Sequence, residues 1–334
     1  MPATSTEDEA MKLVTYGTGK GDSRLGALIG GDAVLDLAQA SGGKPAFASM
    51  QALIDAGADA LAQAKKLAAS ASRDAVSPLS SVKLAAPLPR PVRMRDCSLF
   101  LEHMEAGLNK IARQTADADP DPEAKYAELT GEGGRFRFNP LLKQRVIYYN
   151  CDTLAFSGPD DEIVWPSDSN WMDYELEWAC VVGKPGENVT KEKAREHIFG
   201  YTIFNDWSAR DTQLAVMECN LGPGAGKDFA LSNGIGPCIA TVDEFDDPYK
   251  LTMTARVNGE EWSRGTTGSM HHSFEDAVAE FSRDRSLVPG EMIGSGTVLG
   301  GCGLELGRQL ADGDVVELEI EGIGVLRNKV VRRH

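Results

Sequence analysis

The chain has 334 residues, enough for one large domain beside a small one, and burial of a core is ample at this length. Its formal net charge is −16, with 50 acidic against 34 basic residues, which argues against nucleic acid or an anionic membrane as partner. No run of 18 apolar residues occurs, so the sequence predicts no membrane-spanning helix.

The N-terminal part predicts a leader and a small domain. Residues 1–10 are polar and acidic, and we expect a disordered leader there. Residues 11–86 predict a small β-rich domain, because short apolar runs near 12–16, 25–29 and 33–37 are parted by glycine turns. Residues 45–72 have helical spacing that breaks near Gly57. The proline-rich joint at 85–91 then leads into the second domain, 87–334.

The second domain opens on a stretch that carries Asp96 and His103. These residues are seven apart, two helical turns, so they share a face if the stretch is helical. A lone helical histidine is more often a surface or satisfied residue than a functional one. The acidic, glycine- and proline-punctuated segment 115–138 predicts a mobile loop, either an active-site lid or a surface excursion. Residues 145–156 then return to strand character with Tyr148 and Tyr149.

A strand of carboxylates is predicted over 173–183. Alternate strand residues share a face at ~7 Å spacing, so Glu175 and Glu177 point the same way. One interpretation is a half-exposed strand whose polar face is wet and whose Tyr174, Leu176 and Trp178 point inward. The other is a site for a divalent cation, which would offset the repulsion between the two carboxylates.

Three further polar side chains follow a second strand. The apolar run from Gly200 ends at Asp206, and the helix expected after it carries Arg210 and Gln213, three apart and therefore on one face. A glycine-rich loop then ends in Lys227, without the spacing of a phosphate-binding loop. Because sites are usually built where strand ends meet loops, Asp206 supports the metal interpretation.

The C-terminal third predicts mostly strands. A hairpin over 253–262 turns at Asn258-Gly259, and a helix is expected near 274–281, after a loop that carries His271 and His272. Residues 291–306 predict strand, turn and strand, and 315–330 predict a strand pair that closes the sheet.

Composition also limits the metal and the compartment. With five histidines in the chain, a metal site must rest mainly on oxygen ligands, which suits Mg²⁺, Mn²⁺ or Ca²⁺. The six cysteines are scattered without a C-x-x-C pair, which is typical of a reduced, cytoplasmic protein rather than of a disulfide framework or a zinc site.

The motifs together resemble the fumarylacetoacetate hydrolase family. The likeness is carried by 173–183, by the Asn-Asp-Trp-Ser-Ala-Arg-Asp core at 205–211, by Leu-Gly-Pro-x-x-Gly-Lys at 221–227, by Ser-Gly-Thr at 295–297 and by 313–324. It covers the chain from about Pro87 to the C-terminus. The resemblance implies a mixed β/α fold, in which the family's mixed β-sheet roll follows a small β-rich N-terminal domain, and it implies a homodimer.

The resemblance also implies a function, namely metal-dependent hydrolysis of a C–C bond in a 1,3-dicarbonyl keto acid of the acylpyruvate or fumarylacetoacetate type. An oxaloacetate-type decarboxylase or a keto–enol tautomerase on the same metal site is the alternative. The implied roles are metal ligands, catalytic groups and substrate contacts. Asp96, Glu175, Glu177 and Asp206 hold the ion, and His103, oriented by Glu305, acts as base. Lys227, Arg210 and Gln213 fix the substrate's oxygens, with Lys227 as a catalytic group that helps to stabilise the departing enolate, and Thr297 and one of Tyr148 and Tyr149 contact substrate.

Overall fold

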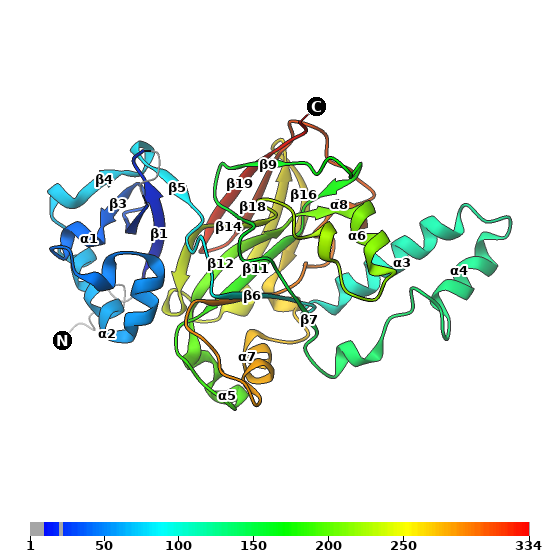
Figure 1. Ribbon diagram of the computed structural model, residues 1–334, viewed down its shortest axis with the longest axis horizontal. Coiled ribbons are helices and arrows are strands. Elements are labelled where there is room, and N and C mark those ends of the chain that lie inside the picture. The colour runs from blue at the N-terminus through cyan, green and yellow to red at the C-terminus, as the bar shows by residue number, and fades with distance from the viewer. Residues whose placement is uncertain (1–9, 20–22, 334) are drawn as a thin grey trace.

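The computed structural model describes residues 10–19 and 23–333, so the expected leader, apart from Ala10, lies outside the described part. In Figure 1 the N-terminal domain lies at one end, two sheets form the body, and the helices α3 and α4 project from the other end. No helix in the described ranges is long and apolar enough to cross a membrane.

The larger sheet joins both domains. Within the described residues it has twelve strands, ten of them in the order β4-β3-β2-β1-β14-β12-β11-β17-β6-β7, with β5 beside β1 and β8 beside β14. Neighbouring strands are antiparallel except at β17–β6 and β14–β8. Its strands are β1 (Lys12–Gly17), β2 (Arg24–Ile29), β3 (Ala33–Asp36), β4 (Val76–Pro78), β5 (Lys83–Ala85), β6 (Arg93–Cys97), β7 (Tyr148–Asn150), β8 (Phe156–Ser157), β11 (Leu176–Val182), β12 (Ile198–Asp206), β14 (Asn233–Thr241) and β17 (Glu291–Gly294).

A second sheet of five strands, in the order β16-β15-β18-β19-β9, packs against the first. Its strands and those of a small two-stranded ribbon are β9 (Glu162–Val164), β15 (Thr252–Val257), β16 (Glu260–Thr266), β18 (Val315–Ile320) and β19 (Gly324–Val331), then β10 (Met172–Asp173) and β13 (Ser208–Ala209). The helices are α1 (Leu37–Ala40), α2 (Met50–Ala69), α3 (Leu101–Ala116), α4 (Pro122–Thr130), α5 (Lys191–Ala194), α6 (Arg210–Met217), α7 (Phe274–Ser282) and α8 (Gly303–Leu306).

Several elements form where the sequence predicted them. The N-terminal strands, the hairpin at Asn258-Gly259 and the helix α7 are confirmed. Asn258 and Gly259 have φ of 52° and 82°, the left-handed backbone that a two-residue hairpin turn requires. Gly57 interrupts α2 with φ 73° and ψ −158°, which confirms the predicted break.

The N-terminal domain is not separate from the body. Its strand β1 pairs with β14 of the large domain through Lys12↔Ala240 and Leu13↔Ile239. The sheet therefore runs without a break across the boundary that the proline-rich joint suggested.

The strand β11 has a buried residue at every position, which fits a strand covered on both faces. Trp178, Cys180 and Val182 belong to the core between the two sheets, where Trp178 packs on Phe274 with ring centroids 4.7 Å apart. Ala179 and Val181 belong to the second core, on the other face. The interpretation of 173–183 as a half-exposed strand with a wet face is therefore wrong.

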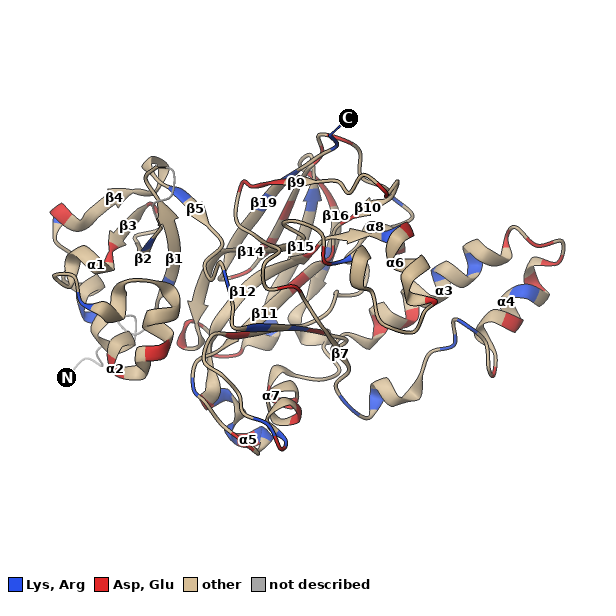
Figure 2. Cartoon of the chain, viewed as in Figure 1, with Lys and Arg blue, Asp and Glu red and all other residues tan. Residues whose placement is uncertain are grey.

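The segment 115–138 is not the loop that its composition predicted. It folds into the end of α3 and the helix α4, whose first turn is capped by Asp121 accepting from the Ala124 backbone N–H. A small core of Ala112, Ala116, Leu129 and Phe136 joins the two helices. Acidic and basic residues are interspersed along both (Figure 2), so the outer surface of this arm is polar.

Three other predictions about elements are corrected. Asp96 does not share a helix with His103, because it lies in the strand β6, which pairs with β17, and α3 begins only at Leu101. Glu305 lies on the single-turn helix α8 rather than on a second strand. The pair β18 and β19 lies inside the five-stranded sheet, between β15 and β9, and does not close the sheet that carries the site.

Candidate metal centre and its cavity

Three carboxylates meet because the ends of three strands lie close together in the larger sheet. Asp96 is the penultimate residue of β6, Glu177 lies at the start of β11, and Asp206 ends β12, which is antiparallel to β11. Each is two residues from a member of the second core, namely Met94, Ala179 and Phe204. Since alternate strand residues share a face, all three carboxylates lie on the same face of the sheet.

The cluster has the donor set of a site for a hard cation. Carboxylate oxygens of Asp96, Glu177 and Asp206 lie within 4.8 Å of one another, and the side chains are buried. Two of their buried oxygens, Glu177 Oε2 and Asp206 Oδ1, have no hydrogen-bond partner. Because buried polar atoms almost always have a partner, the two oxygens fit the role of cation ligands, and an all-oxygen set suits Mg²⁺, Mn²⁺ or Ca²⁺.

A glycine on the intervening strand makes room for the cluster. Gly294 of β17 lies opposite Asp96 of β6 and Ala179 of β11. A Cβ at Gly294 would lie 2.5 Å from Asp96 Oδ1 and 3.3 Å from the ring of Phe204. Any larger side chain at this position would therefore displace the Asp96 carboxylate.

Burial shifts the protonation of the three acids. It raises the pKa of Asp96 to about 6 and that of Asp206 to about 8, and it raises the pKa of Glu177 well above its usual value with further repulsion from Asp96. Each acid therefore holds a proton more tightly than in water, and a bound cation would have to displace it.

Glu175 has a different environment from the three clustered acids. It lies just before β11, and its backbone N–H donates to Asn205 Oδ1 at 3.0 Å. Its carboxylate pairs with Lys227 Nζ at 2.5 Å and with Arg210 Nη1 at 2.8 Å. Burial opposes ionisation there, but Lys227 and Arg210 outweigh it and hold the pKa of Glu175 below its usual range. Its role as a fourth metal ligand stays a prediction.

Lys227 connects Glu175 with the metal cluster. It is fully buried at the end of the glycine-rich loop, after the short turn Gly224–Gly226, and its ammonium also pairs with Asp206. Burial lowers the pKa of Lys227, but the two carboxylates outweigh it and raise that pKa, so the side chain stays charged. The lysine therefore offsets part of the charge of this acidic site.

Sequence reasoning missed the role of Asp173. Its carboxylate accepts from Arg210 Nε at 2.8 Å and from the backbone N–H groups of Gly303 and Leu304 at 2.8 and 3.0 Å. It thereby fixes the guanidinium of Arg210 and caps the helix α8 that carries Glu305. The signal was present in the sequence, because Asp173, Glu175 and Glu177 form an acidic series at every second residue.

A histidine–glutamate pair lies on another wall of the same cavity. His103 Nδ1 is 2.8 Å from Glu305 Oε2, although the two residues are 202 positions apart in the chain. Glu305 also accepts from the Gly300 backbone N–H at 3.1 Å and from the Cys302 thiol at 3.4 Å. With Nδ1 donating to a carboxylate, the other ring nitrogen of His103 is left as a proton acceptor.

The remaining predicted substrate contacts also line this cavity, which has a volume of about 330 Å³. Tyr149 donates to Asp206 Oδ2 at 2.5 Å, whereas the hydroxyl of Tyr148 accepts from Arg285 at 3.3 Å. Thr297 donates to Glu177 Oε1 at 3.1 Å, and Gln213 Oε1 accepts from Arg210 Nη1 at 3.0 Å. The structure thus brings all twelve predicted site residues to one cavity or its wall.

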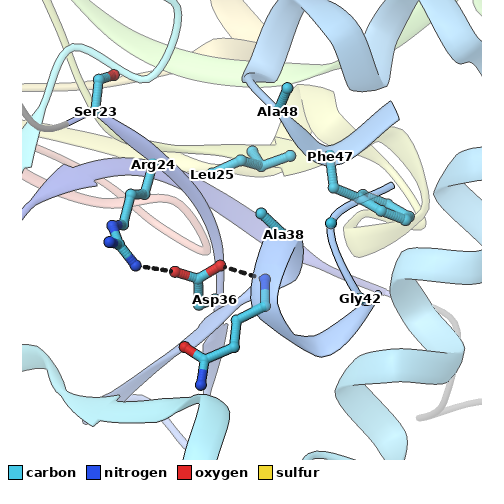
Figure 3. A pocket seen from close by; sticks show the side chains of 10 residues that line it. Ser23, Arg24, Leu25, Asp36, Ala38, Gly42, Phe47 and Ala48 are labelled. Atoms are coloured by element: carbon cyan, nitrogen blue, oxygen red, sulfur yellow. Dashed lines mark hydrogen bonds and ion pairs between the residues drawn. The ribbon is translucent and has the colours of Figure 1, made fainter. Parts of the chain in front are cut away.

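A second hollow, of about 520 Å³, lies in the N-terminal domain (Figure 3). Asp36, the acid among its described lining residues, accepts from Arg24 Nη1 at 2.9 Å, from the Gln39 backbone N–H at 2.8 Å and from the Tyr16 hydroxyl at 3.0 Å. Asp36 therefore caps α1 and forms an ion pair with Arg24. These contacts explain why a carboxylate lies here, and no ligand is needed to explain it.

The family model described as "Fumarylacetoacetate (FAA) hydrolase C-terminal" matches residues 124–331. Human mitochondrial oxaloacetate tautomerase FAHD2A is 36% identical over 193 residues, which are 58% of this chain and 60% of that protein, so this chain spans about three fifths of that relative.

Two solved structures share the fold over nearly the whole chain. Fumarylacetoacetate hydrolase from Exiguobacterium antarcticum is 26% identical with a TM-score of 0.72, and the match covers 97% of this chain and 100% of that one. Maleylpyruvate hydrolase from Sphingobium sp. SYK-6, in complex with manganese(II) ion and pyruvate, is 24% identical with a TM-score of 0.70 and the same coverage.

Proposed function

Because the chain belongs to the fumarylacetoacetate hydrolase family, we propose that it is a divalent-metal-dependent hydrolase that cleaves a C–C bond of an acylpyruvate-type 2,4-dioxo acid. One observation carries this proposal. His103, which is paired with Glu305, lines the same cavity as the carboxylates of Asp96, Glu177 and Asp206. A base and a metal centre that face one space are what activation of water beside a chelated diketone requires.

Asp96, Glu177 and Asp206 would hold the ion, with Glu175 as the fourth candidate ligand. The unpartnered oxygens of Glu177 and Asp206 support this set. The manganese named for the Sphingobium neighbour supports a divalent ion. We propose Mg²⁺ or Mn²⁺, with Ca²⁺ as the third possibility. When bound, the ion supplies a Lewis acid for the dioxo acid's oxygens.

His103 takes the proton in the proposed reaction. Its free ring nitrogen accepts a proton from water, whose oxygen adds to the acyl carbonyl carbon. The bond between C3 and C4 of the dioxo acid then breaks, and its electron pair goes to C3 as the enolate of pyruvate. Return of the proton to C3 gives pyruvate and a carboxylic acid. Glu305 holds the ring in the required tautomer throughout.

Lys227, Arg210 and Gln213 supply fixed donors and charge next to the metal cluster. The Lys227 ammonium lies between Glu175 and Asp206, where it can stabilise the oxygen of a departing enolate. Arg210 fixes Glu175 and is itself held by Asp173. These buried pairs position charge before the reaction begins, which is the main source of electrostatic stabilisation in enzymes.

Oxaloacetate tautomerisation is the second candidate function. The human relative with 36% identity carries that name, and this observation favours it. A tautomerase would use the same metal site on another keto acid, oxaloacetate, but it moves a proton between C3 and the C2 oxygen and consumes no water. A homodimer and a cytoplasmic location stay predictions.

The test compares acetylpyruvate with oxaloacetate. Protein stripped with EDTA should cleave no acetylpyruvate, and added Mg²⁺ or Mn²⁺ should restore the release of pyruvate and acetate in equal amounts. Full turnover by stripped protein would refute the metal site. Interconversion of oxaloacetate tautomers without cleavage of any acylpyruvate would refute the hydrolase and favour the second candidate.

A further inference from the structure

The wall of the cavity that α3 provides changes from polar to apolar along the helix. His103 lies in its first turn, and Met104, Leu108 and Ile111 follow on the same side of the cavity. At 1.5 Å per residue, His103 and Ile111 are about 12 Å apart along the helix axis. Gly107, between them, brings the backbone itself to the cavity surface.

The helix α6 on another wall has the same polarity gradient. Arg210 and Gln213 line the cavity in the first turn, and Leu214 and Met217 line it in the second. These four positions are spaced at i, i+3, i+4 and i+7, so they form one face of the helix. Both helices therefore have polar groups near the metal cluster and only apolar side chains farther out.

The outer part of the cavity offers no partner for a second acid group. Among the described lining residues, the lysine and arginine side chains are Lys227 and Arg210, and both pair with buried carboxylates at the inner end. A distal carboxylate on a substrate would therefore lose its water without gaining a cation, which is unfavourable.

The apolar wall continues to the surface. Met217 is 46% exposed, and Leu221, next to the lining residue Gly222, is 92% exposed. Exposed single apolar residues are common, but Met217 continues an apolar wall that begins inside the cavity. Methionine side chains also adapt to ligands of different shape.

We infer that the outer cavity is a binding site for an apolar acyl tail, so that the preferred ligand is a keto acid with one carboxylate and an alkyl or aryl tail. The carboxylate and keto oxygens would occupy the inner, polar end, and the tail would lie between α3 and α6. The inference rests on the proposed function for its keto acid end, whereas the tail site rests on the cavity wall alone.

Binding of non-reacting 2-oxo acids tests the tail site without turnover. Calorimetry with Mg²⁺-loaded protein would compare pyruvate, 2-oxobutanoate, 2-oxohexanoate and 2-oxooctanoate. Affinity should rise about threefold to fourfold per methylene while the tail is being buried. The dicarboxylate 2-oxoadipate, matched in length to 2-oxohexanoate, should bind no more tightly than pyruvate. Affinity that is flat with chain length, or preference for 2-oxoadipate, would overturn the inference.

A pair of variants on α6 sharpens the test. Leu214→Arg places a cation in the tail site and should reverse the preference, so that 2-oxoadipate binds more tightly than 2-oxohexanoate. Ala215→Arg adds the same charge at the next, exposed residue of the helix, outside the lining, and should keep the parent's preference. Unchanged pyruvate binding in both variants shows that the fold and the inner, metal-binding end of the cavity are intact. Equal effects of the two variants would contradict the tail site.

The two proposals fail in different ways. A length-dependent affinity in a protein that cleaves no acylpyruvate would leave the tail site standing and remove the hydrolase. Cleavage of acetylpyruvate and of a decanoyl homologue with equal kcat/KM would keep the hydrolase and remove the tail site.

Discussion

Replacing Glu177 with glutamine should stabilise the metal-free protein. Carboxylate oxygens of Glu177, Asp96 and Asp206 lie within 4.8 Å of one another, and at an effective dielectric of about 20 each ionised pair repels by about 3.5 kcal/mol. At about pH 8.5 Asp206, with its pKa of about 8, is mostly ionised, so the folded parent bears either this repulsion or the uptake of a proton by Glu177, whose pKa is raised well above its usual value, and both lower its stability. The neutral amide keeps an acceptor for Thr297. We therefore expect the free energy of unfolding to rise by about 1–3 kcal/mol.

The metal response of this variant should change in the opposite direction. A cation at 100 times its Kd stabilises the parent by about 2.7 kcal/mol, and Glu177→Gln should lose most of that increment. Urea unfolding followed in EDTA and again in saturating Mg²⁺ measures both effects.

Glu291→Gln is the matched control, because Glu291 is equally buried but pairs with Arg93 at 2.6 Å and with Arg95. Loss of that charge leaves a buried arginine unpaired and should cost about 3–5 kcal/mol with the metal increment unchanged. If Glu177→Gln destabilises the metal-free protein as Glu291→Gln does, and Mg²⁺ stabilises both equally, the metal assignment is wrong.

Three further predictions concern the site. His103→Ala should lower acylpyruvate cleavage by about 10²–10⁴-fold with metal affinity retained, as judged by calorimetry beside turnover, whereas an equal, small loss on acetylpyruvate and oxaloacetate would remove His103 from the mechanism. Gly294→Ala should weaken metal binding while Mg²⁺-free unfolding stays cooperative, because its Cβ would lie 2.5 Å from Asp96 Oδ1; an unchanged metal Kd counts against the crowding argument. Because burial raises the pKa of Asp96 to about 6 and of Asp206 to about 8, the folded protein holds protons that the unfolded chain has released. These two groups therefore make the free energy of unfolding of the metal-free protein fall as the pH rises towards 8. Because Mg²⁺ must displace the same protons, its affinity should fall on the order of 100-fold when the pH is lowered from about 8.5 to about 6. A pH-independent Kd would contradict this account.

The sequence correctly predicted the elements whose structure depends on residues close together in the chain. The strand that ends at Asp206, the helix face of Arg210 and Gln213, and the turn at Asn258-Gly259 all follow from the spacing of neighbouring residues. The family likeness supplied the partner of His103, because no spacing argument connects it to Glu305, 202 residues away.

The errors arose where distant contacts override composition. The segment 115–138 is polar, yet α4 forms because Leu129 and Phe136 pack on α3. Asp96 precedes a helix, yet pairing of β6 with β17 holds it on a strand. Glu177 has a sequence pattern that fits a wet strand face, and only the sheet order shows that it is buried.

The pairing of β1 with β14 has a consequence for how this protein can be shortened. Removing residues 1–86 would leave the backbone groups around Ile239 and Ala240 of β14 without their neighbour strand. An uncovered strand of apolar residues is a template for association between chains. The small domain thus covers this strand, and truncations meant to isolate the large domain should keep β1 or replace it.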